Sequence, residues 1–396
     1  GRPAAAAAAA AATARRDDGG WRSACLSGAR RVACGTMEPS LPDGEQAKLP
    51  GEPLPDGPLL NGRYQRVNLL GQGAFGSVEL VRDVKTNKFA ALKRLHRRNM
   101  NKYLEAEIVN HSLLCHPHIV QFSEVFTTEE YVCFVMEYAN GGSLFDMVRK
   151  CRRLRETQAR WFFQQLILAI DYCHRRGVAN RDIKLENCLL QNESGLPHPL
   201  LKLCDFGYSK HEKFQSAPGS RVGTPAYLAP EVILTTKGKT YDGKTADVWS
   251  CGVMLFVMLV GAYPFERPED KQDNQKLQKM IQRILNVEYK IPSSVKVSDD
   301  CRDMLKRILV ADPTKRITID GIFHHPWYTK NLPPGVIEMN KRPPPTPAGM
   351  QTVEQVKLIL AEARKAQGNA LGAGIETDEY LNDAMDGLAD DEALDY

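Results

Sequence analysis

The segment "VANRDIKLENCLL", residues 178–190, decides the fold because it spaces four polar side chains as a phosphoryl-transfer loop requires. Those side chains are Arg181, Asp182, Lys184 and Asn187. Asp182 is placed to orient a hydroxyl nucleophile and take its proton, a role that contributes roughly 10²- to 10⁴-fold in rate. Lys184 can balance charge on the migrating phosphoryl group. The segment therefore predicts a catalytic loop.

A second motif supplies the expected metal ligands. The string "KLCDFGYSK", residues 202–210, places Asp205 eighteen residues after Asn187. Asn187 and Asp205 offer the hard oxygen ligands that Mg²⁺ prefers while it bridges the phosphates of ATP. Either residue alone would by default have a buried structural role. Combined with "GTPAYLAPE", residues 223–231, the spaced set is too specific to arise by chance, and it predicts a protein phosphotransferase.

A glycine-rich turn lies in "YQRVNLLGQGAFGSVELVRDVKTNKFAALKRL", residues 64–95, between expected strands at 67–70 and 78–81, and a third strand is expected at 89–95. A dinucleotide fingerprint would open a helix after its glycines, whereas β-branched sequence follows here. The pattern favours a hairpin whose backbone N–H groups approach nucleotide phosphates, with a plain β-turn as the alternative. The residues expected to contact the nucleotide are Gly71, Gln72, Gly73, Ala74, Phe75, Gly76, Ser77 and Val78.

An ion pair is expected between the third strand and the helix that follows. Lys93 lies near the end of that strand, and residues 103–114 have apolar side chains at helical spacing. We predict Glu107 rather than Glu105 as the partner of Lys93, because Glu107 directly precedes Ile108 in the periodic stretch. A solvated surface charge is the alternative for either residue alone, but the order of strand, glycine loop, strand, Lys and helical Glu favours the pair.

Composition limits the architecture and the compartment. A chain of 396 residues with 43% hydrophobic and 25% charged residues can bury a large core, so we expect one bilobed catalytic unit plus tails. The most apolar stretch, residues 251–265, is too short and too interrupted to span a bilayer, so a buried helix is expected. Ten scattered cysteines without a C-x-x-C pair favour reduced thiols and argue against a disulfide frame or a zinc site. The expected location is the cytoplasm and/or the nucleus.

The two ends of the chain differ in charge and composition. Residues 376–396 contain nine acidic residues and no Lys or Arg, so with a net charge of +4 overall the preceding residues carry +13. Such an acidic arm either stays solvated or docks on a basic partner. At the other end, the Ala-rich residues 1–36 read as a cloning or gene-model extension or a disordered tail before Met37, with a transit peptide as the weaker alternative. Pro and Gly then dominate residues 38–61, as in a linker.

These motifs together resemble a complete eukaryotic Ser/Thr protein kinase domain over residues 64–327. The strings "VGTPAYLAPEV", "YDGKTADVWSCGVMLFVMLVGAYPFE", "IQRILNVEYKIP" and "VADPTKRITI" narrow the resemblance to the plant sucrose-nonfermenting-related kinases of subfamily two, which osmotic stress and abscisic acid activate. The resemblance implies an α+β, bilobed fold: a small β-rich N-lobe at about 64–136 and a larger helical C-lobe at about 139–327. The kinase domain is expected to be preceded by a disordered extension at residues 1–63.

The resemblance extends beyond the catalytic domain, through a linker at 328–349 and a regulatory-box helix at 350–366 to an acidic disordered tail at 367–396. "MQTVEQVKLILAEARKA" has Thr352 and Gln355 at capping-box spacing and a stripe of apolar residues: Val353, Val356, Leu360 and Ala363. So short a helix needs a surface to pack on, and in the family that surface is the small lobe near the Lys-pairing Glu. An ordinary C-terminal helix without regulatory effect is the alternative.

The expected function is transfer of phosphate from ATP, with Mg²⁺, to Ser or Thr hydroxyls of protein substrates; Glu137 and Tyr138 are also expected at the nucleotide. Arg181 should need an anionic partner from the activation segment. The string "KFQSAPGSRVGTPAY" offers Ser220 and Ser216, and the resemblance favours Ser220 as the main phosphosite. Thr224 is expected to help position Asp182. The alternative from another class is a pseudokinase scaffold that binds nucleotide and partner proteins without catalysis.

Two residues depart from the family pattern. Asn180 replaces a histidine that supports the D-F-G phenylalanine, Phe206, so we expect looser support there but retained chemistry. Ser143 in "NGGSLFD" replaces a common Glu, which leaves Glu186 as the acidic candidate for contacting a basic substrate residue. The partners that the resemblance implies are an upstream kinase or autophosphorylation, and an inhibitory type 2C protein phosphatase at the acidic tail. No nucleic acid or membrane partner is expected.

Overall fold

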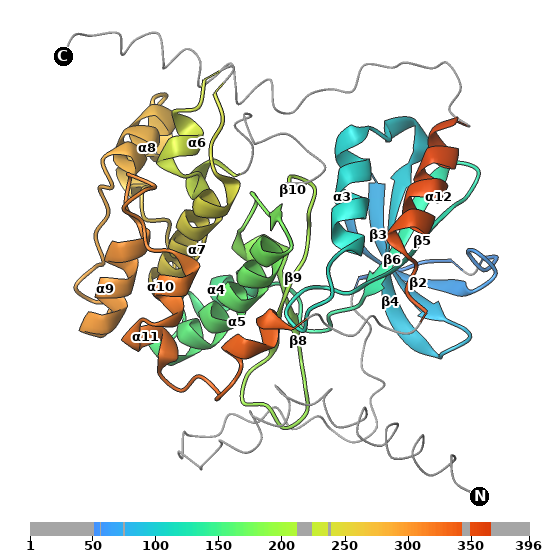
Figure 1. The fold of residues 1–396 in the computed structure, drawn as a ribbon, viewed down its shortest axis with the longest axis horizontal. Coiled ribbons are helices and arrows are strands. Elements are labelled where there is room, and N and C mark those ends of the chain that lie inside the picture. Colours follow the sequence, from blue (N-terminus) through green and yellow to red (C-terminus); the bar gives the residue numbers. More distant parts are fainter. Residues whose placement is uncertain are drawn as a thin grey trace, which may run out of the picture.

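The smaller of two lobes is an antiparallel sheet with strand order β1-β2-β3-β4-β6-β5 (Figure 1). The computed structural model describes residues 51–55, 57–73, 76–211, 224–236, 239–342 and 349–365. The strands of this sheet are β1 (Glu52–Pro53), β2 (Tyr64–Gly73), β3 (Gly76–Asp83), β4 (Lys88–His96), β5 (Phe122–Thr127) and β6 (Tyr131–Glu137). The α+β, two-lobed class predicted from the sequence is confirmed, and the three strands expected in residues 64–95 are present and longer than expected.

One short strand lies where disorder was expected. β1 pairs Glu52 with Leu69 and Pro53 with Asn68, so part of the predicted N-terminal extension joins the sheet. Its position is at the sheet edge, where a proline costs no ladder hydrogen bond. Leu54 adds a backbone hydrogen bond to Val67 at 2.9 Å. The expectation of disorder throughout residues 1–63 is therefore wrong for this segment.

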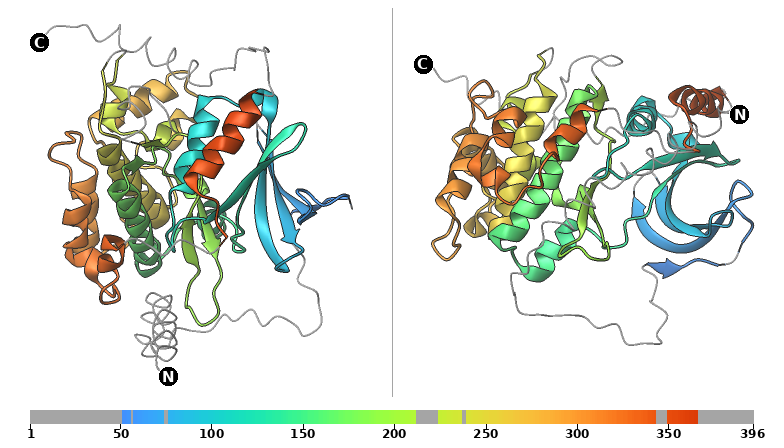
Figure 2. Two further views of the ribbon diagram at one scale, coloured as in Figure 1. Left: turned by 45° about the vertical axis from the view of Figure 1, so that its right-hand side comes forward. Right: turned by 60° about the horizontal axis from the view of Figure 1, so that its bottom comes forward.

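Two helices from distant parts of the chain cover one face of the sheet. α3 (Lys102–Ser112) and α12 (Val353–Lys365) lie next to each other there (Figures 1 and 2). Their apolar stripes meet in one buried cluster with the sheet, whose members include Leu104, Ile108, Phe122, Val125, Val356, Leu360 and Ala363. The alternation of polar and apolar residues at helical spacing thus gives each helix a buried face and a solvated face.

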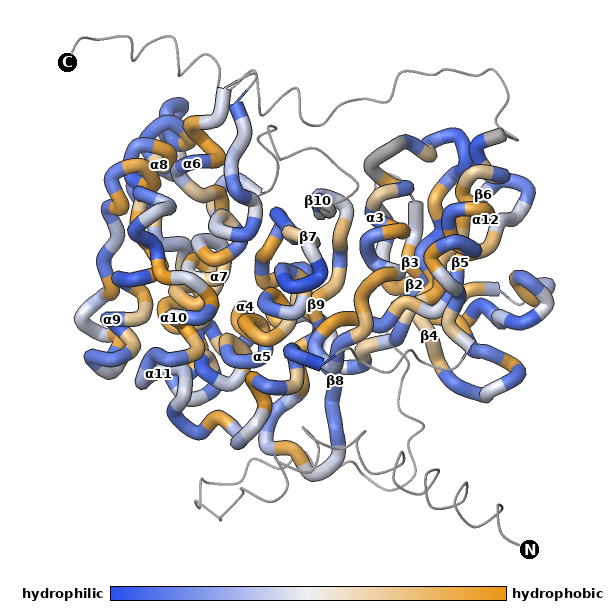
Figure 3. Tube along the Cα trace, viewed as in Figure 1, coloured by the Kyte–Doolittle hydropathy of each residue, from blue (hydrophilic) through white to orange (hydrophobic). Residues whose placement is uncertain are grey.

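The larger lobe is mainly helical. Its helices are α4 (Leu144–Cys151), α5 (Glu156–Arg175), α6 (Pro230–Ile233), α7 (Gly243–Val260), α8 (Lys276–Leu285), α9 (Asp299–Ile308), α10 (Ile319–Phe323) and α11 (Pro326–Thr329). Only α7 among the described helices is long and apolar enough to cross a membrane, and 78% of that stretch is buried inside the protein. Figure 3 shows this hydrophobic helix within the lobe, as expected of a core helix.

Short elements between the lobes position the polar motifs. Two small two-stranded sheets pair β7 (Val178–Ala179) with β10 (Lys210–His211), and β8 (Cys188–Gln191) with β9 (Leu200–Leu203). The single-turn helices are η1 (Arg97–Asn99), η2 (Leu185–Asn187), η3 (Pro225–Tyr227), η4 (Pro268–Gln272) and η5 (Ile337–Lys341). The predicted catalytic loop therefore runs from β7 to β8 through η2, and Asp205 lies two residues after the end of β9.

Candidate active site

The glycine-rich segment forms a hairpin, as the sequence predicted, and does not open a helix. β2 and β3 pair Gly71 with Val78, Gln72 with Ser77, and Gly73 with Gly76. A Cβ atom on Gly76 would lie 1.8 Å from the carbonyl oxygen of Arg94, so only glycine lets β3 approach β4 this closely. Two of the residues predicted to contact nucleotide, Ala74 and Phe75, lie outside the described residues.

Lys93 lies opposite Val78 in the sheet and forms an ion pair with Glu107 of α3. The distance from Nζ to Oε1 is 2.5 Å, and the Glu107 side chain is only 5% exposed. Burial disfavours the charge on Lys93, but the carboxylates of Glu107 and Asp205 outweigh it and raise the pKa of Lys93 above its usual range. Lys93 is therefore a fixed cation beside β3 of the glycine-rich hairpin. Its partner is Glu107, as predicted from the sequence.

Three of the predicted site residues converge on the carboxylate of a fourth, Asp182. Asp182 Oδ2 lies 2.7 Å from Lys184 Nζ and accepts a hydrogen bond from Asn187 Nδ2 at 2.9 Å. Lys184 also donates to the hydroxyl of Thr224 at 3.1 Å, and that hydroxyl donates to Asp182 Oδ1 at 3.4 Å. Burial raises the pKa of Asp182, and Lys184 acts in the opposite direction. The carboxylate is oriented from two sides, by the loop itself and by the segment before η3.

Asp205 lies between the Lys93 pair and the Asp182 cluster. Burial is the largest influence on both neighbours, lowering the pKa of Lys93 and raising that of Asp182, and the charge of Asp205 raises the pKa of both. The two groups therefore share one electrostatic environment. Cys204 donates a backbone hydrogen bond to Asn187 at 2.9 Å, which holds the two predicted ligands together. Asn187 gives its amide NH₂ to Asp182, so its carbonyl oxygen is the atom suited to a metal. One amide and one carboxylate oxygen donor fit Mg²⁺.

Asn180 connects the two acidic motifs. Its side-chain NH₂ donates to the carbonyl oxygen of Asp205 at 3.0 Å, and its side-chain oxygen accepts from the amide of Asp182 at 3.1 Å. The ring of Phe206 is instead tilted against His111 of α3, with centroids 5.1 Å apart. Asn180 is fully buried. It therefore retains hydrogen-bonding support for the motif although it contributes no ring.

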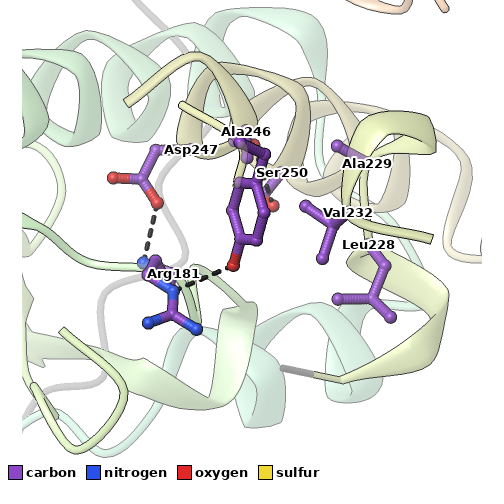
Figure 4. A pocket seen from close by; sticks show the side chains of 8 residues that line it. Arg181, Leu228, Ala229, Val232, Ala246, Asp247 and Ser250 are labelled. Atoms are coloured by element: carbon purple, nitrogen blue, oxygen red, sulfur yellow. Dashed lines mark hydrogen bonds between the residues drawn. The ribbon is translucent and has the colours of Figure 1, made fainter. Parts of the chain in front are cut away.

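Two residues that the sequence analysis did not single out hold Arg181. Its Nε donates to the hydroxyl of Tyr241 at 3.0 Å, and its backbone amide donates to Asp247 of α7 at 2.7 Å (Figure 4). Asp247 also accepts from the amide of Asn180 at 2.9 Å and lies 2.7 Å from His174. The string "YDGKTADVWS", residues 241–250, contains both residues and is the part of the sequence that could have indicated them.

The comparison with known proteins agrees with this geometry. Residues 64–328 match the protein kinase domain. The chain belongs to the protein kinase family. It is similar to serine/threonine-protein kinase SRK2A of Physcomitrium patens, with 47% identity over 332 residues that cover 82% of this chain and 90% of that protein.

Two further relatives come from flowering plants. Serine/threonine-protein kinase SRK2E of Arabidopsis thaliana is 48% identical over 305 residues, which cover 76% of this chain and 82% of the relative. Serine/threonine-protein kinase SAPK1 of Oryza sativa is 49% identical over 321 residues, with 79% and 90% covered. The resemblance to plant kinases of subfamily two is thus confirmed, and the chain is a protein-serine/threonine kinase.

The segment joining the lobes of this kinase is fixed by an ion pair that the sequence did not predict. Glu137, at the end of β6, forms an ion pair with Lys202 of β9 at 2.6 Å and accepts a hydrogen bond from the amide of Gln121 at 3.1 Å. Tyr138 follows it, with a pKa raised by burial. Because the Glu137 carboxylate is committed to Lys202, a nucleotide at this position would meet the backbone rather than that side chain.

Ser143, the second departure from the family pattern, and Glu186, the remaining acidic candidate, occupy different environments. Ser143 caps the N-terminus of α4: its hydroxyl accepts from the amide of Asp146 at 3.0 Å and donates to that residue's carboxylate at 2.7 Å. Glu186, in the catalytic loop, has one carboxylate oxygen that is buried and has no hydrogen-bond partner among the described residues. The substitution at Ser143 therefore removes a carboxylate but gains a helix cap. The predicted phosphosites Ser216 and Ser220 lie outside the described residues.

The segment predicted to be a regulatory box packs on the small lobe through polar contacts as well as apolar ones. The capping box is present, with Thr352 N donating to Gln355 at 2.9 Å and Gln355 N donating to Thr352 at 3.2 Å. The side-chain amide of Gln351 pairs with the backbone of Val125 on edge strand β5, at 2.7 and 3.0 Å. Glu105, the rejected partner of Lys93, instead accepts from Arg364 of α12 at 2.8 Å. The helix that carries Glu107 is thus bound directly by α12.

Part of the predicted linker is anchored to the larger lobe. Asn340 in η5 donates to the carbonyl oxygen of Leu168 at 2.7 Å and to the carboxylate of Asp171 at 3.0 Å. Its side-chain oxygen lies 3.0 Å from His116 Nε2, in the loop that follows α3. The chain between the catalytic domain and α12 is therefore attached to both lobes.

Proposed function

We propose that this kinase transfers the γ-phosphate of ATP through a catalytic group in which Asp182 receives the proton of the substrate hydroxyl. The observation that carries this assignment is the convergence of Lys184, Asn187 and Thr224 on the Asp182 carboxylate, which fixes its orientation toward one position. Lys184 then neutralises charge that develops on the phosphoryl oxygens.

The nucleotide and metal are assigned to the neighbouring residues. The backbone of the glycine hairpin would cover the phosphates, and Lys93, held by Glu107, would bind them as a cation. Asn187 and Asp205 would hold Mg²⁺ through their side-chain oxygens. The chemistry that bound Mg²⁺ would supply there is neutralisation of the phosphate charge. ATP and Mg²⁺ are the general requirements of the family.

Radiolabel transfer to a Ser/Thr peptide tests the assignment and the rival pseudokinase scaffold. Asp182→Asn should lower kcat by about 10²-fold or more while leaving ATP binding nearly unchanged, because Asp182 faces the hydroxyl. Asp205→Ala should instead weaken Mg²⁺-dependent nucleotide binding. Transfer by the unaltered chain that equals transfer by Asp205→Ala would support the scaffold and reject the enzyme.

We infer the regulation from the resemblance to stress-activated plant kinases. Phosphorylation at Ser220, by an upstream kinase or by the enzyme itself, would activate the protein. A type 2C phosphatase that recognises the acidic tail would inhibit it. The cation that would receive the phosphate is Arg181, which lies beside Tyr241. The protein would act in the cytoplasm and/or nucleus. Ser220→Ala should leave only weak basal activity, and full activity of that variant after treatment with an upstream kinase would exclude Ser220.

A further inference from the structure

A dense group of cations lies on the surface where α4 ends and α5 begins. Five of seven consecutive residues are basic and exposed, and we call them the α4–α5 basic patch: Arg149, Lys150, Arg152, Arg153 and Arg155. Arg153 reaches the carbonyl oxygen of Ser294 at 3.4 Å, which brings the loop containing the exposed Lys296 alongside.

Few of these charges are neutralised by the fold. Arg149 pairs with Asp146, but the two side chains are 72% and 59% exposed, so the pair is weak. Lys150 and Arg152 form no side-chain hydrogen bond or ion pair with any residue that the structure describes. Glu156, the next carboxylate along the chain, is engaged by Ser298 and Trp327. The patch therefore presents excess positive charge to solvent.

We propose that the α4–α5 basic patch is the intramolecular docking site of this chain's own acidic segment, residues 376–396. Charge complementarity identifies the occupant: the segment has nine carboxylates and no Lys or Arg. A tethered segment also competes at an effective concentration that reaches about millimolar for short linkers, which favours it over a free acidic partner of similar charge. The interaction is between solvated charges, so it weakens as salt shortens the Debye length from about 10 Å at 0.1 M to about 3 Å at 1 M.

The length of chain available is sufficient. Residues 366–396 follow the end of α12 as described, and these 31 residues can extend to roughly 100 Å. A folded domain of about 300 residues has a radius of gyration of about 19 Å, so any part of its surface can be reached. The carboxylates near the end of the segment, Asp390, Asp391, Glu392 and Asp395, have the greatest reach.

Docking there would connect the tail with the catalytic cleft. α4 starts at Leu144, in contact with η2 of the catalytic loop, and its eight residues span about 12 Å to the patch. A docked tail is withheld from other basic partners, and α4 connects its docking site with the catalytic loop. The docking itself depends only on charge and does not rest on the proposed catalytic function, so Asp182→Asn should dock equally well.

Zero-length carbodiimide cross-linking of the full chain, followed by peptide mapping, tests the proposal. It should join Lys150 to carboxylates of residues 376–396, with a yield that does not change over a tenfold range of protein concentration. Raising NaCl from 0.05 to 1 M should reduce that yield at least fivefold. A yield that rises with concentration would show contact between two copies and overturn the intramolecular assignment.

Charge reversal provides the matched control. Arg152→Glu with Arg153→Glu should lower the Lys150 cross-links at least fivefold, whereas Lys306→Glu with Lys330→Glu, exposed elsewhere on the same lobe, should not. Neutralising the other side, with Asp390→Asn, Asp391→Asn and Glu392→Gln, should reproduce the loss without altering the folded surface. The patch would be rejected if the cross-links between Lys150 and the tail persisted in both the patch variant and the tail variant. It would also be rejected if the tail cross-links mapped chiefly to other lysines.

Discussion

The side-chain amide of Asn180 bridges the catalytic loop and the metal-ligand motif, donating to the Asp205 carbonyl oxygen at 3.0 Å and accepting from the Asp182 amide at 3.1 Å. Asn180, which in the sequence indicated the loss of a supporting histidine, thus links the two motifs by hydrogen bonds in the structure. It ties the position of the expected proton acceptor to that of an expected metal ligand through one rigid planar group.

Asn180→Ala should therefore be more damaging than Asn180→His. Alanine leaves a buried carbonyl and a buried amide unpaired, at a cost of about 1–3 kcal/mol each, so both the melting temperature and kcat should fall. Histidine can still donate one hydrogen bond to Asp205 and restores a ring near Phe206, so activity should be kept or raised. Thermal melts and peptide phosphorylation measure both effects, and a sharp loss of activity in Asn180→His would contradict this account.

Tyr241 should matter for the switched-on state. Its hydroxyl accepts from Arg181 at 3.0 Å, and a hydrogen bond to a charged group contributes about 1.5–3 kcal/mol. Tyr241→Phe should lower the activity of the phosphorylated kinase several-fold, because the guanidinium loses its fixed direction. In a Ser220→Ala background the same change should have little effect. Equal losses in both backgrounds, measured by peptide phosphorylation, would show that Tyr241 acts independently of the phosphosite.

Two leucines of α12, one buried and one exposed, allow the effect of lost packing to be measured separately from the effect of replacing a leucine. Leu360 is 3% exposed in the cluster beneath α3, whereas Leu358 on the same helix is 65% exposed. Leu360→Ala should destabilise the protein by about 2–5 kcal/mol if the site does not collapse, and should lower kinase activity because α3 and Glu107 lose support. Leu358→Ala should change stability by less than about 0.5 kcal/mol. Denaturant unfolding and kinase assays of the two variants compare them directly; equal effects would remove α12 from the support of α3.

Acid should destabilise the fold through buried histidines. Burial lowers the pKa of His111 to about 4 and that of His116 to about 3. The unfolded chain binds protons at these two histidines near pH 6.5, whereas the folded chain does not. Their contribution to the free energy of unfolding is therefore fully present above pH 6.5 and is lost as the pH falls toward 4. Each unit of pKa difference corresponds to about 1.4 kcal/mol. The urea midpoint should fall between pH 7 and 5, and His111→Leu should flatten that slope relative to the exposed His324→Asn; an unchanged slope would contradict this prediction.

Much of the fold and of the site could be predicted from residues adjacent in sequence. The glycine pattern before β-branched residues predicted a hairpin, and the helical periodicity around Ile108 distinguished Glu107 from Glu105 as the partner of Lys93. The spacing of Asp182 and Asn187 within one loop, with Asp205 after a strand, likewise indicated a shared site. These signals are local: they depend on backbone period, turn chemistry and short offsets, which the order of residues specifies directly.

Only the tertiary structure decided which distant side chains meet. Arg181 and Tyr241 are sixty positions apart, and Gln351 binds the backbone of Val125 from 226 positions away. No period or spacing encodes such pairs, because they depend on how the two lobes and α12 pack after each element has formed. The same holds for Glu105: as a sequence it was a rejected alternative to Glu107, and in the fold it faces the opposite way and accepts from Arg364.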